Sequence, residues 1–117
     1  MGNDNSFRLY VWQRATAILM VPLIATHLVL VIYATRHQLT AGDILARTRG
    51  SFAWAAFYSA FVGAAAIHGA IGVRSVMSDW VRTSDTVRNC VMWVFGVLLA
   101  LLGLRAVAAV IWPGMLG

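Results

Sequence analysis

The chain has 117 residues, of which 61% are hydrophobic and 11% are charged, and its formal net charge is +5. A soluble domain of this length cannot bury so large an apolar share in one core, so the composition excludes an ordinary soluble fold and indicates a membrane protein. The basic residues are all arginine and are spread through the ends and joints of the chain. This distribution excludes a nucleic-acid-binding face and is typical of charges that flank membrane spans.

Three apolar stretches are long enough to cross a bilayer, which takes about 20 helical residues. We expect transmembrane helices at about residues 10–34, 52–76 and 91–112, in contact with membrane lipid. Two polar joints separate them, and the sequence contains no internal repeat or linker. The predicted fold is therefore all-α, with one transmembrane domain over residues 1–117.

The first stretch carries two ionisable side chains, which are costly inside a membrane and usually functional there. Arg14 lies near the N-terminal entrance of this stretch. His27 lies roughly 25 Å along a helix from Tyr10, in the far half of the membrane. Arginines are more numerous on the N-terminal side and in the second joint than in the first joint. The positive-inside rule therefore predicts a cytoplasmic N-terminus.

The second stretch places several polar residues on one helix face. At 100° per residue, His68, Gly72 and Asp79 lie together, and the small residues around them let another helix or a flat ligand approach the backbone. Two interpretations stay open: His68 ligates a haem, or it packs closely and bonds a neighbour's carbonyl. Arg14 is placed to meet a negative group just below His68, either a haem propionate or Asp79. Arg74 either extends to the interface or contacts the ligand.

The positions of the two histidines limit how a haem is held. His27 and His68 lie at different depths, so they cannot both ligate one iron within a single copy. A second axial ligand for His68 must come from another chain or be absent. In the third stretch, we expect Arg105 to pair with a partner chain. The single Cys90 excludes an internal disulfide.

Two segments, "QRATAI" in the first stretch and "IHGAIGVRSVMSDW" at the end of the second, resemble the membrane-anchor subunits of succinate dehydrogenase (complex II). The resemblance implies a three-helix subunit of either anchor type in the bacterial inner (cytoplasmic) membrane. Its partners would be a second anchor subunit that completes the helical bundle, an iron–sulfur subunit and a flavoprotein subunit. The chain would pass electrons from the iron–sulfur subunit to quinone without being catalytic itself.

The same resemblance implies the cofactors and their residues. Haem b would lie between the anchors with His68 as an axial ligand, and Arg14 or Arg74 would contact a propionate or the quinone. Ubiquinone or menaquinone would bind near Arg14, Asp79 and Trp80. Trp80 stands where one anchor type has a tyrosine that donates to the quinone, and an indole N–H is also a donor. For His27 two interpretations stay open: it ligates a distal haem, as in anchors that hold two, or it is a buried, hydrogen-bonded histidine.

Two other classes of function compete with this interpretation. One is a cofactor-free structural or assembly subunit, in which His68 only packs. The other is a small transporter, which fits less well because the ionisable residues gather on one side of the membrane rather than at its midplane.

Overall fold

The structure, a computed structural model, describes the backbone of residues 2–115 and the side chains of residues 6–115. It contains four helices: α1 (Gly2–Arg36), α2 (Ala41–Thr48), α3 (Phe52–Trp80) and α4 (Asp85–Ile111). Three segments, Ser6–Arg36, Phe52–Trp80 and Asp85–Ile111, are long and apolar enough to cross a membrane. The all-α prediction with three membrane-spanning helices is confirmed, and the chain is a multi-pass membrane protein.

The helices around the second joint are longer than the predicted spans. α3 continues through Trp80 rather than ending near residue 76, and α4 begins at Asp85 rather than near residue 91. The hydroxyl of Ser84 accepts a hydrogen bond from the Val87 N–H, and Asp85 lies in the first turn, so the polar residues themselves start α4. A window of apolar residues cannot locate such helix ends, because polar capping residues set them.

The first joint holds a short helix, α2, that the sequence analysis treated only as polar chain. Thr40 and Asp43 form a capping box, in which each side chain accepts a hydrogen bond from the other's backbone N–H. These hydrogen bonds hold the pKa of Asp43 below its usual value. Thr48 Oγ1 and Gly50 N donate to the carbonyls of Val110 and Ile111, each at 2.8 Å. The joint is therefore fastened to the end of α4.

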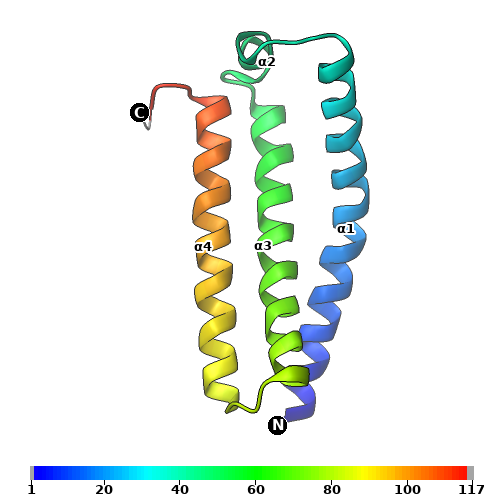
Figure 1. Ribbon diagram of the computed structural model, residues 1–117, viewed down its shortest axis with the longest axis vertical. Helices are drawn as coiled ribbons and strands as arrows, with labels where there is room; N and C mark the ends of the chain where they lie inside the picture. Colours follow the sequence, from blue (N-terminus) through cyan, green and yellow to red (C-terminus); the bar gives the residue numbers. More distant parts are fainter. Residues whose placement is uncertain (1, 116–117) are drawn as a thin grey trace.

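The three long helices stand side by side with α3 in the middle (Figure 1). α3 packs on α1 along one side and on α4 along the other. Small residues bring α3 and α4 close: a Cβ at Gly96 would lie 3.1 Å from the Ala70 Cβ, and a Cβ at Gly103 only 2.5 Å from Val62 Cγ1. The N-terminus and the α3–α4 joint lie at one end of the bundle, and α2 lies at the other.

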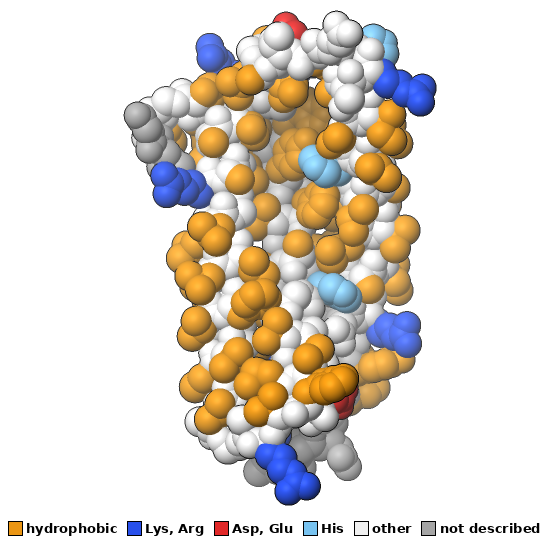
Figure 2. All heavy atoms as spheres, viewed as in Figure 1, with side chains coloured by type: hydrophobic (Ala, Val, Ile, Leu, Met, Phe, Trp, Pro, Cys, Tyr) orange, Lys and Arg blue, Asp and Glu red, His pale blue; other side chains and the backbone are white. Residues whose placement is uncertain are grey.

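The core of this bundle is small. The described residues with buried apolar side chains are Ala64, Ala66, Ala70, Ile71, Val107 and Ile111. Large apolar side chains remain exposed on all three long helices, and Figure 2 shows them over the sides of the molecule from end to end. Exposure on this scale requires lipid or other protein chains around the helices.

Candidate functional site

His68 lies on the side of α3 that contacts α1, at the edge of the interface. Its Nδ1 is 3.3 Å from the backbone carbonyl oxygen of Gln13 and 3.3 Å from Thr16 Oγ1. Thr16 is buried, with 5% of its surface exposed, and its hydroxyl lies 2.8 Å from the Trp12 carbonyl oxygen. The imidazole is therefore held by the backbone and a hydroxyl of α1.

These contacts define what the imidazole can bind. A carbonyl oxygen only accepts hydrogen bonds, so Gln13 selects the neutral tautomer with the proton on Nδ1. In that tautomer Nε2 carries the free lone pair, and no residue within the described part of the chain bonds it. A metal-ligating histidine has this arrangement, with its second ring nitrogen bonded to a carbonyl. The donor set at His68 thus fits haem iron.

α1 lies close to α3 in the turn that follows His68. A Cβ at Gly72, one turn further along α3, would lie 3.7 Å from Gln13 Nε2, so α1 approaches the α3 backbone closely at this level. His68 itself is only half-buried. In Figure 2, histidine side chains are visible at separate heights in the hollow between α1 and α3.

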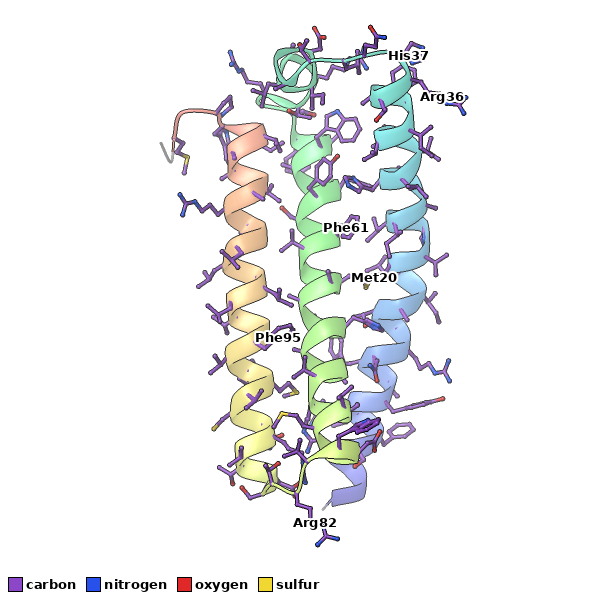
Figure 3. The ribbon with its side chains drawn as sticks, viewed as in Figure 1. Met20, Arg36, His37, Phe61, Arg82 and Phe95 are labelled. Atoms are coloured by element: carbon purple, nitrogen blue, oxygen red, sulfur yellow. The ribbon has the colours of Figure 1, made fainter. Side chains whose placement is uncertain are left out.

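His27 lies at a different level of the same interface. Its ring makes edge contacts with Tyr58 and Phe61, with ring centroids 5.8 Å and 5.6 Å apart. Its Nδ1 is buried and lacks a hydrogen-bond partner among the described residues. Met20 and Phe61 lie in the space between α1 and α3 (Figure 3). The two histidines therefore do not share a ligand within one copy, as the depth argument predicts.

The predicted rim of Arg14, Asp79 and Trp80 is not assembled within this chain. Arg14 is exposed, and its guanidinium carbon lies 5.3 Å from the centroid of the Tyr10 ring. Asp79 is exposed, and Trp80 is 84% exposed. Gln13 contacts both His68 and Gly72, so Asp79 lies about two turns or more further toward the end of α3 than Arg14. No ion pair joins Arg14 to Asp79 in the portion that the structure describes.

Arg74 serves the α3–α4 contact. Its Nε donates to Asn89 Oδ1 at 2.7 Å, and one terminal nitrogen lies 4.0 Å from the Asp85 carboxylate. Its side chain is only 18% exposed. Arg88 pairs with the same carboxylate and donates to the Thr83 carbonyl. The structure therefore brings Arg74 together with α4 rather than with His68.

Gln13 and Thr16 are the site residues that the sequence analysis missed. Gln13 acts through its backbone carbonyl, which every residue possesses, so its type carries no signal. Thr16 could have been found by its spacing. The less exposed positions of α1 recur every three or four residues, at Leu9, Gln13, Thr16, Met20, Leu23, His27 and Leu30. The Thr16 hydroxyl donates to the Trp12 carbonyl of its own helix, and its position on the inward face brings its oxygen within 3.3 Å of His68 Nδ1.

The described residues contain no cluster of three or more histidine, cysteine, aspartate or glutamate side chains that could hold a bare metal ion.

Comparison with known proteins identifies the family. The family described as succinate dehydrogenase/fumarate reductase transmembrane subunit matches residues 5–104, which include His68, Arg14, Arg74, Asp79, Trp80 and His27. No curated protein and no solved structure gave a significant match. Family members belong to complexes with other subunits. With a match over most of its length and three apolar membrane-spanning helices, the chain belongs to the succinate dehydrogenase/fumarate reductase transmembrane subunit family.

Proposed function

We propose that this chain is a membrane anchor of a succinate:quinone oxidoreductase in the bacterial inner membrane, with its N-terminus in the cytoplasm. It binds haem b through His68 and contributes to a quinone site, so that electrons pass from an iron–sulfur subunit to ubiquinone or menaquinone. A flavoprotein partner oxidises succinate or reduces fumarate, and a second anchor subunit completes the bundle. The family match supports the complex, and the geometry at His68 supports the haem.

The observation that carries the proposal is the Nδ1 contact of His68 with the Gln13 carbonyl. It holds the ring in the tautomer that leaves Nε2 free, and Thr16 packs beside it. Arg14, on the exposed side of α1 next to Gln13, is level with the ring and is the candidate partner of a propionate. The haem, when bound, supplies a one-electron carrier. The second axial ligand comes from the partner anchor.

The quinone site is proposed at the end of α3, where Asp79 and Trp80 are exposed. Asp79 would deliver protons from water to the quinone oxygens, and the Trp80 indole would donate a hydrogen bond. Arg14 is a turn or more away from Asp79 within this chain. The cationic side chain nearest the quinone therefore belongs to a partner subunit, or to Arg14 in another side-chain conformation.

The surroundings of His27 support the proposal of a second, distal haem. Its buried Nδ1 has no partner in the described part of the chain, which is an uncommon state for a buried ring nitrogen. Metal ligation by a partner-completed site would explain its presence between Tyr58 and Phe61. The haem content per complex decides between one haem and two.

The test is His68→Ala in the complex purified through this chain, compared with His37→Ala. His37 stacks on Tyr33 at the opposite end of the bundle and is exposed, so its loss controls for removing an imidazole. We expect a reduced-minus-oxidised spectrum with b-type bands in the wild type and in His37→Ala, and their loss in His68→Ala. Retention of the bands in His68→Ala would refute the ligand assignment. Absence of bands in the wild type would favour a cofactor-free anchor.

A further inference from the structure

The side chain of Gln13 is a polar amide within a membrane-spanning helix, and the contact with His68 does not use it. That contact is made by the backbone carbonyl of Gln13. The residue is half-buried, and its amide nitrogen would lie 3.7 Å from a Cβ at Gly72. Within the described part of the chain, the hydrogen bonds around this level involve Thr16, His68 and backbone carbonyls but not the Gln13 amide. Polar side chains are costly in a membrane span and usually serve a ligand or a partner there.

The Gln13 amide lies between His68 and the end of α3 that carries Asp79. The N-terminus and the α3–α4 joint lie at one end of the bundle, so α1 and α3 run antiparallel (Figure 1). A helical side chain leans toward the N-terminus of its own helix, which for α1 is the direction of Asp79. The amide nitrogen is accordingly found at Gly72, one turn beyond His68.

The spacing from Gly72 to Asp79 matches a quinone ring that is bonded at both oxygens. At 100° per residue the two positions point within about 20° of each other, and they are roughly 10 Å apart along the helix. The two oxygens of a para-quinone are about 5 Å apart and each hydrogen bond adds about 2.8 Å, so the ring connects groups about 11 Å apart. Ser75 and Val76, which lie between the two positions, are both exposed. No described side chain therefore covers the face along which such a ring would lie.

The other donors on this part of α1 are engaged or unsuited. The Thr16 hydroxyl donates to the Trp12 carbonyl. The Arg14 guanidinium stacks over the Tyr10 ring, with its carbon 5.3 Å from the ring centroid. A guanidinium forms its strongest bonds with carboxylates and phosphates, whereas a neutral amide suits a neutral carbonyl oxygen.

We propose that Gln13 is a quinone-binding residue. Its amide donates a hydrogen bond to one quinone oxygen, while Asp79 and Trp80 serve the other. The ring then lies along α3 between Gly72 and Asp79, with one edge directed toward His68. This inference rests on the proposed quinone site at the end of α3 and adds the donor for the second oxygen.

The first experiment is Gln13→Met in the complex purified through this chain, with Leu23→Met as the matched control. Methionine keeps the length and helix propensity of glutamine but lacks the amide. Leu23 lies on the same inward face of α1, almost three turns away. We expect the KM for ubiquinone-1, or for menaquinone-1 measured in parallel, to rise about tenfold in Gln13→Met and to stay unchanged in Leu23→Met. Succinate oxidation with a soluble acceptor and the haem bands should stay as in the wild type.

The second experiment observes the hydrogen bond itself. Infrared difference spectra are recorded on the complex with ubiquinone-1 carrying ¹³C at one carbonyl or at the other. Loss of a hydrogen bond raises the stretching frequency of a carbonyl, so Gln13→Met should shift one labelled carbonyl and Trp80→Phe the other. Gln13→Asn keeps an amide but withdraws it by one methylene, and it should shift the same carbonyl as Gln13→Met.

Each outcome decides between distinct assignments. Unchanged KM and unchanged carbonyl bands in both Gln13 variants would overturn the role of Gln13 and leave the quinone site at Asp79 standing. Altered haem bands with an unchanged quinone KM would assign the amide to a haem propionate and would also overturn the proposal. A wild-type complex that reduces neither quinone would refute the proposed quinone site itself, a failure that no Gln13 variant can produce.

Discussion

At the scale of single residues, the contact between α1 and His68 controls the properties of the proposed ligand. The Nδ1 proton has two acceptors within reach, the Gln13 carbonyl and the Thr16 hydroxyl, both at 3.3 Å. Acceptors on the far nitrogen raise the basicity of the ligating one. A more basic ligand favours oxidised iron. Thr16 therefore acts as a positioning residue for His68.

Thr16→Val should raise the midpoint potential of the haem. Valine keeps the shape of threonine but removes one acceptor, while Thr16→Ser keeps the hydroxyl and serves as the control. A hydrogen bond is worth about 1 kcal/mol, and a tenfold change in a one-electron equilibrium is about 59 mV, so the rise should reach roughly 40 mV. Potentiometric titration of the haem bands measures it. Identical potentials in the wild type and Thr16→Val would show that the hydroxyl does not reach the ring.

Asp79→Leu should reduce quinone reduction by about a hundredfold, because it removes the proposed proton donor at the end of α3. Succinate oxidation with a soluble acceptor, which takes electrons before the membrane, should be unchanged. The control is Ser78→Ala, since the Ser78 hydroxyl bonds only the Arg74 carbonyl of its own helix. If both activities of Asp79→Leu fell equally, Asp79 would be structural and the quinone site would lie elsewhere.

At the scale of helices, the α3–α4 contact depends on glycines, which have no side chain to hold the two helices apart. Gly103 lets Val62 approach its Cα, and Gly96 does the same for Ala70. Without a hydrophobic driving force between helices in lipid, such close packing is a main source of association. At the end of the bundle that holds the α3–α4 joint, Arg74 and Asn89 add a hydrogen bond between the same two helices.

Gly103→Ala should destabilise the assembled protein, since the new methyl would lie 2.5 Å from Val62 Cγ1 and force the helices apart. Overpacking of this kind costs about 1–3 kcal/mol. Gly63→Ala is the matched control, because open space surrounds its Cβ position. Thermal unfolding in detergent, followed by circular dichroism, should give a lower midpoint for Gly103→Ala alone. Equal midpoints for the two variants would mean that α4 shifts freely along α3.

At the scale of the whole molecule, three helices in a row make an incomplete bundle. α3 is covered on two sides, whereas α1 packs mainly on α3, and α4 packs on α3 along its length and on α2 at its end. Large apolar side chains such as Ile18, Val29 and Leu102 remain exposed in the chain alone. The row therefore leaves apolar faces of all three long helices for lipid or other protein chains to cover.

The chain expressed alone and reconstituted with haem should not give the low-spin spectrum of iron held by two histidines. His68 is level with Gln13, and His27 lies more than two turns away along α1. The far axial position of a haem at His68 therefore has no histidine within the same copy. Visible and electron paramagnetic resonance spectra test this, with the copurified complex as the reference. A clean two-histidine signal from the isolated chain would contradict the depth argument.

The sequence predicted the three spans because twenty apolar residues leave no alternative to a membrane helix. It did not predict α2, which is eight residues long and is set by the capping box at Thr40 and Asp43. The His68 face was predictable from helical periodicity. The offset between α1 and α3 was not, since it depends on how the two helices pack. That offset places Gln13 opposite Gly72 and separates Arg14 from Asp79.

The two hydrogen bonds from Thr48 and Gly50 to the carbonyls of Val110 and Ile111 connect the joint between α1 and α3 with the last turn of α4. The residues that donate these bonds are synthesised long before α4, whose end must cross the membrane to meet them. The loop on that side therefore acquires its final shape only when translocation of the last helix is complete.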